Sequence, residues 1–228
     1  MQFHIISLFT KPLKAYFGES ILKRAQDKGL ISVVLHNLRD FSPDLKHHKV
    51  DAPPYGGGPG MVLQFEPMAK AVAFAMGGVA GAEGRKKEKS KVRVILFSTR
   101  GKKLDAKMAQ RLAKYDSLVL LCGRYEGVDE RVAKYLADEE VSLGDFVLSG
   151  GEIPAMALVD AVARFLPEVL GKRESLEEVK GSYPTYTRPE VVEYLIGARS
   201  KKLKVPAELL TGNHAKIAEW RKRHKMSF

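Results

Sequence analysis

Short apolar runs alternate with helical patterns along the first 166 residues, and this alternation limits the fold more than any other feature. Four runs are rich in bulky or β-branched residues typical of buried strands: 2–9, 31–37, 92–97 and 117–122. Four other segments carry helical spacing or helix-start residues: 12–28, 66–76, 106–114 and 128–136. Strands that alternate with helices form largely parallel sheets. The sequence therefore predicts an α/β domain over residues 1–166.

Two glycine-bearing loops follow apolar runs in the second half of this domain. The stretch SLGDFVLSGGEIP, 142–154, is typical of a strand, a glycine turn and a helix that begins near Glu152. The stretch LLCGRYEGVDERV, 120–132, places Arg124, Tyr125 and Glu126 between two glycines. Ligands of open α/β sheets lie where strand ends meet loops. The pair favours one cleft with apolar walls and main-chain polar groups, suited to adenine, although a buried strand ending in a turn stays the alternative.

A third loop, DAPPYGGGPGM at 51–61, is too rich in proline and glycine for regular structure. It is either a flexible connector or a shaped binding loop, in which Tyr55 and Met61 offer surface for a base. No Lys-Ser/Thr pair follows the glycines, so a phosphate-binding P-loop is not indicated. A GxGxxG dinucleotide fingerprint is also absent from the sequence.

Charge and cysteine content narrow the class of partner. The formal net charge is +11, which favours a polyanion, nucleic acid before membrane, over a merely solvated basic surface. The single cysteine, Cys122, excludes an intrachain disulfide and a cysteine-rich zinc site, and we expect it to be a packed strand residue. No apolar run reaches the length of a membrane span, so we expect a cytoplasmic protein that does not contact membranes. The sequence assigns no metal ligands.

The composition changes after the α/β domain. Residues 167–185 are predicted to be a linker, and 186–228 a small domain without an independent core. Within that domain Pro189 is expected at the start of a helix, and Asn213 at the cap of an amphipathic helix that carries Trp220. The basic end of this last helix could contact phosphates.

Four motifs in order carry a family resemblance: PYGGGPGM, CGRYEGVDERV, SLGDFVLSGGE-PA and YTRPEV–LLTGNH. Together they resemble the bacterial tRNA (guanine-37-N1)-methyltransferase family, TrmD, of the SPOUT superfamily, over roughly 1–166 and 183–224. The resemblance implies a SPOUT-type, largely parallel α/β sheet with a deep C-terminal trefoil knot, plus a small helical C-terminal domain. It implies methyl transfer from S-adenosylmethionine to N1 of guanine 37 of tRNA. It further implies a homodimer whose sites form between subunits, and a C-terminal domain that grips the anticodon region.

Carried over by motif, the residues implied to bind the methyl donor are Leu96, Phe97, Ser98, Gly123, Tyr125, Glu126, Gly127, Leu143, Gly144, Asp145, Phe146, Val147, Leu148, Gly150, Gly151 and Pro154. The residues implied to lie at the target guanine are Tyr55, Gly56, Gly57, Gly58, Pro59 and Gly60.

The resemblance also implies a catalytic pair. Guanine N1 carries a proton, so a carboxylate acting as general base is useful, and a guanidinium can stabilise the charge that then develops on O6. The arginine maps to Arg164. The family's linker aspartate has no counterpart in KRESLEEVKGSYPT, where Glu177 and Glu178 are the nearest carboxylates and Glu178 is preferred. A role for magnesium is left open.

Two further departures concern the C-terminal part. The linker and the C-terminus are shorter than the family's pattern, and the segment YLIGARSKKLK before Val205 is longer and basic. We therefore expect Lys201, Lys202 and Lys204 to contact tRNA, so that their loss weakens binding and its salt dependence. The alternatives to the methyltransferase are a non-catalytic RNA-binding protein of the same fold and a methyltransferase with a different RNA target.

Overall fold

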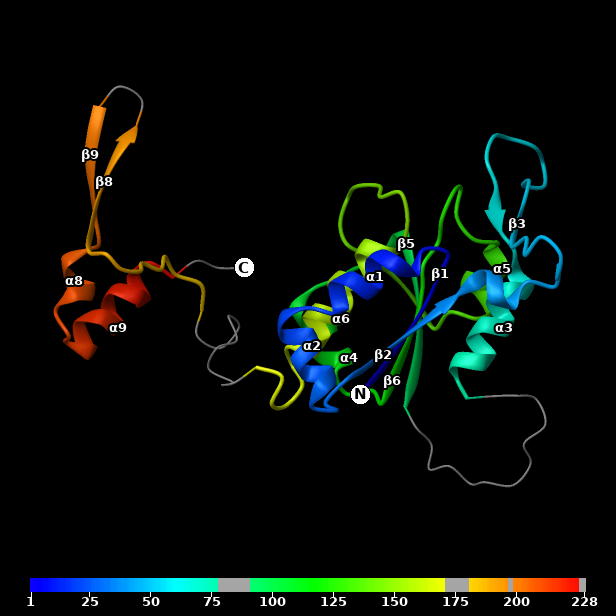
Figure 1. Ribbon diagram of the computed structural model, residues 1–228, viewed down its shortest axis with the longest axis horizontal. Helices are drawn as coiled ribbons and strands as arrows, with labels where there is room; N and C mark the ends of the chain where they lie inside the picture. Colours follow the sequence, from blue (N-terminus) through cyan, green and yellow to red (C-terminus); the bar gives the residue numbers. More distant parts are fainter. Residues whose placement is uncertain (78–90, 171–180, 197–198, 226–228) are drawn as a thin grey trace. The chain divides into compact units, whose positions relative to one another are not determined.

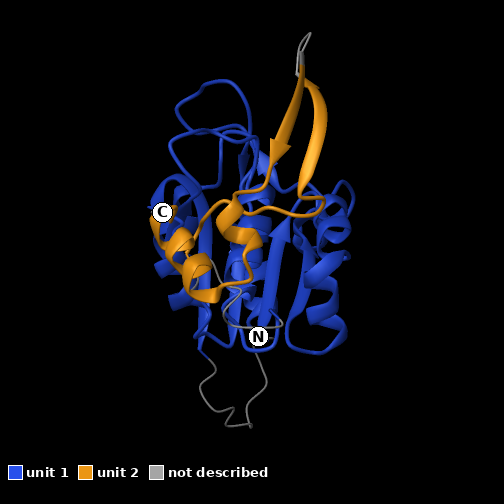
Figure 2. Cartoon of the chain, turned by 90° about the vertical axis from the view of Figure 1, so that its left-hand side faces the viewer, with its two compact units in different colours: residues 1–171 blue, residues 172–228 orange. Residues whose placement is uncertain are grey.

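The chain divides into two compact units, residues 1–171 and 172–228, which are coloured separately in Figure 2. The computed structural model describes residues 1–77, 91–170, 181–196 and 199–225. The division falls inside the segment 167–185 that the sequence assigns to a linker. Among the described residues, no helix has both the length and the apolar character needed to cross a membrane.

Unit 1 is built on a five-stranded parallel sheet (Figure 1). Its strands are β1 Gln2–Ser7, β2 Ser32–Asn37, β5 Val92–Lys103, β6 Ser117–Leu121 and β7 Glu139–Ser142. Their order is β2-β1-β6-β5-β7, and every adjacent pair is parallel. The predicted parallel α/β sheet is confirmed.

Helices cover both faces of this sheet. One face carries α1 Thr10–Phe17, α2 Ser20–Asp27, α4 Ala106–Leu112 and α6 Glu152–Ala163. The other carries the 3-10 turn η1 Leu38–Phe41, α3 Phe65–Ala75 and α5 Glu130–Tyr135. In β6, Leu118 and Leu120 pack into the first layer while Val119 and Leu121 pack into the second. Because both faces of β6 are buried, its sequence is a continuous apolar run, and this run made the strand predictable.

Some boundaries differ from the sequence prediction. The single helix expected at 12–28 is two helices, because Gly18 ends α1 and Ser20 begins α2 with a left-handed φ of 51°. Strand β5 runs through its expected exit loop to Lys103, with a register shift between Phe97 and Lys102. The strand expected at the start of 142–154 is β7, which ends at Ser142, and residues 143–151 form the expected loop between β7 and α6.

The short antiparallel strands β3 Asp51–Ala52 and β4 Val62–Leu63 bracket the glycine-rich loop. Asp51 pairs with Leu63, and Ala52 pairs with Val62. Both ends of the loop are therefore tied together at its base.

Unit 2 contains the hairpin of β8 Val191–Ile196 and β9 Arg199–Lys204, followed by α8 Ala207–Leu210 and α9 His214–Arg223. The helix expected from Pro189 is wrong: the β-branched and aromatic residues of VVEYLI form a strand whose main chain pairs with the basic segment. The small domain is thus not purely helical. The cap at Asn213 is confirmed, because its side chain accepts bonds from the amides of Ala215 and Lys216.

Candidate functional site

A cavity of about 490 Å³ opens in unit 1 at the ends of β6 and β7, beside the register shift of β5. Residues from three parts of the chain line it. These are 96–100, then 123–128 and Glu130, then 140–143, 146–151 and Pro154. This is the carboxyl edge of parallel strands, where ligands of α/β sheets bind. Its volume lies in the range of cofactor sites.

The structure brings nearly all the predicted donor-binding residues to this one cavity. Those in its lining are Leu96, Phe97, Ser98, Gly123, Tyr125, Glu126, Gly127, Leu143, Phe146, Val147, Leu148, Gly150, Gly151 and Pro154. Gly144 and Asp145 are not in the lining. The Gly144 amide bonds the Ser142 hydroxyl, and Asp145 pairs with Lys103 at 2.5 Å. Both lie in the loop that follows β7 without facing the cavity.

The two glycine loops are joined directly through their main chains. The Gly151 amide donates to the Gly123 carbonyl at 3.0 Å, and Arg124 and Gly150 form an antiparallel bridge. A Cβ on Gly151 would lie 2.6 Å from the Cys122 Cα, and one on Gly150 would lie 2.3 Å from the Arg124 Nε. Glycine is therefore required at position 151 for the loops to approach this closely, and at position 150 it leaves room for the Arg124 side chain.

A buried carboxylate fastens this junction to the sheet. Glu152 is 4% exposed, and its Oε1 accepts a 2.6 Å bond from the Ser7 hydroxyl at the end of β1. Its Oε2 accepts a 2.9 Å bond from the Arg124 Nε. Arg124 also donates to the Ser149 carbonyl at 3.1 Å, and its guanidinium lies 4.7 Å from the centre of the Phe9 ring. One carboxylate thus links β1, both loops and the start of α6.

Sequence reasoning placed Arg124 in its motif without a role and missed Ser7. The signal for Arg124 was its position between a strand end and a glycine turn. Ser7 comes from the far end of the chain, so no local pattern could connect it to Glu152.

Cys122, next to this network, is fully buried, and burial together with the nearby Glu152 charge raises the pKa of its thiol well above the usual value. It is a packed residue, as predicted.

A second arginine stands at the exposed side of the cavity. Arg100 donates to Glu130 at 2.7 Å and to Glu140 at 3.0 Å, and the Glu130 hydrogen bond is the main reason its pKa is raised. None of these three was predicted. With Glu126, the lining holds three glutamates and two arginines, so its formal charge is negative. That charge attracts a cationic ligand.

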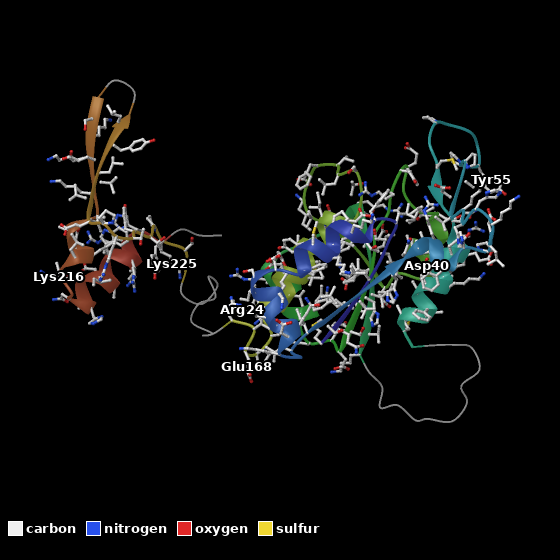
Figure 3. All side chains as sticks on the ribbon, viewed as in Figure 1. Arg24, Asp40, Tyr55, Glu168, Lys216 and Lys225 are labelled. Atoms are coloured by element: carbon white, nitrogen blue, oxygen red, sulfur yellow. The ribbon has the colours of Figure 1, made fainter. Side chains whose placement is uncertain are left out.

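The predicted guanine loop, residues 55–60, lies against the loop that carries Glu126. The Glu126 amide bonds the Met61 carbonyl at 3.1 Å, and a Cβ on Gly60 would lie 2.5 Å from the Glu126 carboxylate. Tyr55 is fully exposed at 103% and is labelled on this loop in Figure 3. Gly56, Gly57, Gly58 and Pro59 are also exposed. The loop therefore adjoins the cavity and offers its tip to a large partner.

Of the two predicted catalytic residues, Arg164 does not line this cavity. Arg164 follows the last residue of α6, whereas Pro154 in the first turn lines the cavity. Pro154 and Arg164 are ten positions apart along the helix, which is a rise of about 15 Å. Glu177 and Glu178 lie outside the described residues. Within the described residues, no group of three or more histidine, cysteine, aspartate or glutamate side chains is placed to hold a metal ion.

Comparisons with known proteins agree along nearly the whole chain. The family model described as tRNA (Guanine-1)-methyltransferase TrmD matches residues 1–227. The tRNA (guanine-N(1)-)-methyltransferase of Geotalea uraniireducens (strain Rf4) is 46% identical over 231 residues, covering 99% of this chain and 86% of that protein. The protein of that name from Dictyoglomus turgidum (strain DSM 6724 / Z-1310) is 46% identical, covering 99% and 85%.

A solved structure gives the same result for the fold. The crystal structure of tRNA (m1G37) methyltransferase from Aquifex aeolicus matches with a TM-score of 0.76 and 40% identity. The match covers 98% of this chain and 88% of that chain. The similarity therefore extends over the cavity and unit 2 alike.

Proposed function

This chain belongs to the tRNA (guanine-1)-methyltransferase family TrmD, and from that membership we infer its activity. It is an enzyme that transfers a methyl group from S-adenosylmethionine to N1 of guanine 37 in tRNA. The observation that carries this conclusion is the family match from residue 1 to residue 227, because it includes every segment that lines the cavity. A non-catalytic or retargeted RNA-binding role is not favoured.

We assign the methyl donor to the cavity at the carboxyl edge of the sheet. S-adenosylmethionine, when bound, supplies a methyl group on a sulfonium cation. The apolar side chains of Leu96, Leu143 and Leu148 would contact the faces of adenine, and the main chain of the two joined glycine loops would meet its polar edge. The negative charge of the lining suits the sulfonium.

The guanine would lie between this cavity and the loop at residues 55–60. We propose that Glu178 removes the proton from guanine N1, with Glu177 as the other candidate, and that the Arg164 guanidinium stabilises the charge that moves to O6. An ionised carboxylate is the base that this step requires. Magnesium could assist by binding carboxylate oxygens, for which we assign no ligands.

Arg164 supports a homodimer whose sites form between subunits. It lies past the end of α6 while the start of that helix lines the cavity of its own chain, and we propose that a second copy supplies it to the guanine. We also propose the deep knot of the family. The loop 143–151 leaves β7 at one edge of the sheet, meets Gly123 after β6, and continues into α6, which packs against α1 and α4.

The remaining assignments follow from the substrate. Residues 1–166 would hold the donor, 167–185 would act as a linker, and 186–228 would contact tRNA. The net charge of +11 favours this polyanionic partner. We place the enzyme in the cytoplasm with its substrate.

The test is methyl transfer from labelled S-adenosylmethionine to two tRNA transcripts that differ only in guanine or adenine at position 37. We expect transfer to the guanine transcript alone. Two variants, Glu178→Gln and Arg164→Ala, should each lower the rate constant of transfer by about 100-fold or more, because each removes a group that we propose to act on the guanine. Arg164→Ala should leave donor binding unchanged, because Arg164 does not line the donor cavity.

The matched control for the base is Glu177→Gln, which removes the neighbouring charge. An active Glu178→Gln enzyme with an inactive Glu177→Gln enzyme would move the base to Glu177. Transfer to neither transcript, with donor binding intact, would contradict the activity and favour a different RNA target.

A further inference from the structure

The β8–β9 hairpin of unit 2 is a two-stranded sheet with both faces exposed. In Figures 1 and 2 its strands extend away from α8 and α9 of the same unit. Five of its large apolar side chains are exposed: Val191, Val192, Tyr194, Leu195 and Leu203. A two-stranded hairpin is only marginally stable alone, so apolar residues at such positions favour a partner that covers them.

The register divides these residues between two faces. Directly opposite residues share a face, so Tyr194 beside Lys201 and Val192 beside Leu203 form what we call the tyrosine face. Tyr194 is 64% exposed. The other face, which we call the ion-pair face, carries Glu193 opposite Lys202, and their side chains pair at 2.9 Å.

Lys201 and Lys202 therefore have different neighbours across the hairpin. The charge of Lys202 is already matched by the carboxylate of Glu193. Lys201 lies opposite an aromatic ring instead of a carboxylate. Only the tyrosine face places an exposed ring and a cation side by side on one surface.

We propose that the tyrosine face binds an unpaired nucleotide of the tRNA, with the base stacked on Tyr194 and a phosphate held by Lys201. This inference rests on the proposed function, which supplies the tRNA, and it assigns one surface of unit 2 to that substrate. Proteins bind single-stranded RNA by stacking bases on aromatic rings while basic residues follow the phosphates. A ring beside a cation matches a base beside its phosphate, and an RNA loop offers charge complementarity to a chain of net charge +11.

The inference refines the expectation that Lys201, Lys202 and Lys204 act alike. On the hairpin, Lys202 and Lys204 share the ion-pair face, and Lys201 faces the other way. Side-chain alternation along a strand makes this division unavoidable once the register is set. Of the three lysines, Lys201 is therefore the one that we expect to contact a phosphate of the tRNA.

The experiment measures binding of a fluorescently labelled tRNA transcript with guanine at position 37, over a series of salt concentrations. Tyr194→Ala should weaken binding about 5- to 100-fold, the range found when a stacked base loses its ring. Lys201→Gln should lower the slope of log affinity against log salt by about 0.7–0.9. The matched control Lys202→Gln, with Glu193→Gln to keep the net charge of the protein unchanged, should behave like the wild type.

A second control on the same hairpin, Leu195→Ser, separates binding from folding because Leu195 lies on the ion-pair face. Equal losses for Leu195→Ser and Tyr194→Ala would overturn the proposal, and so would equal slopes for the two lysine variants. A changed molar mass of the Tyr194→Ala protein in solution, with tRNA affinity unchanged, would assign the face to a second copy and overturn it too. Failure of the wild type to bind tRNA would instead contradict the proposed function, so the two failures are distinguishable.

Discussion

At the scale of single residues, the site depends on one carboxylate, Glu152, that does not line the cavity. Glu152 receives bonds from Ser7 and Arg124, and through them it fixes where both glycine loops stand. It is buried, so its charge is unfavourable unless both partners stay in place. The role of Glu152 is therefore to position the cavity.

The variant Glu152→Gln should test this. It keeps the shape but removes the charge that holds Arg124, so the Kd for S-adenosylmethionine should rise about tenfold or more, equivalent to about 1.4 kcal/mol. Calorimetry with the donor alone measures it. Glu139→Gln is the matched control, because Glu139 is likewise paired with arginines, Arg93 and Arg111, but neither of these lines the cavity, whereas Arg124 does. A donor Kd unchanged by Glu152→Gln would refute the positioning role.

Two cavity glycines should respond differently to the same added methyl group. A Cβ at Gly151 meets the Cys122 main chain at 2.6 Å, whereas one at Gly123 meets only the Val128 side chain at an ordinary 3.5 Å. Gly151→Ala should lower the free energy of unfolding by about 1–3 kcal/mol and weaken donor binding, because the loops must separate. Gly123→Ala should stay close to the wild type in both measurements. Equal donor affinity in the two variants would argue against the tight junction.

The residues show what local pattern can and cannot predict. Glycine spacing revealed that the loops after β6 and β7 meet, because close approach needs glycine wherever it occurs. The same spacing could not reveal Ser7 or Arg100. Their roles depend on partners 145 and 40 positions away in the chain, Glu152 and Glu140 respectively. Contacts of that range follow from the fold rather than from the motif.

At the scale of elements, the bounds of strand β7 and the whole of strand β9 could not be predicted from the sequence because charged residues interrupt the apolar pattern. The pairing of these two strands with neighbouring strands identifies them. Strand β7 begins with Glu139 and Glu140, which no apolar pattern would place in a sheet, yet Arg93, Arg111 and Arg100 neutralise them. Strand β9 consists mostly of basic and polar residues, and only its register with β8 makes it a strand. The apolar strands β1 and β6 were predicted because burial on the sheet determines their composition, and the edge strand β2 was predicted from its β-branched residues.

A histidine pair joins β1 to the edge strand β2 and should make stability depend on pH. His4 Nδ1 and His36 Nε2 lie 2.9 Å apart, so the two rings share one proton. Burial lowers the pKa of both below the ordinary 6.5, and the charge of His4 lowers that of His36 further. The unfolded chain therefore binds more protons, so stability is full above about pH 6.5 and falls as the pH drops below it.

Thermal unfolding at about pH 7.5 and about pH 5.5 measures this effect. The midpoint of the wild type should fall on acidification, and His4→Gln should reduce the fall because it removes one of the two titrating rings. His47→Gln is the control, since His47 is exposed in a loop. The same acid loss in His4→Gln and the wild type would contradict a role for the pair.

At the scale of the whole molecule, the cavity and the arginine that we propose to be catalytic, Arg164, stand apart in one chain. The cavity lies at the start of α6 and Arg164 lies just past its end. A symmetric dimer solves this separation when each subunit supplies Arg164 to the cavity of the other. The arrangement predicts that two defective chains can restore each other.

Co-expression of an Arg164→Ala chain and a Gly151→Ala chain with different tags allows the hybrid dimer to be purified. If the sites form between subunits, one site of the hybrid combines the intact cavity of the first chain with Arg164 of the second. The other site carries both defects. The hybrid should then show about half the methyl-transfer activity of the wild-type dimer, although each parent dimer is inactive. If each site lay within one chain, both sites of the hybrid would be defective, and an inactive hybrid would therefore refute the shared site.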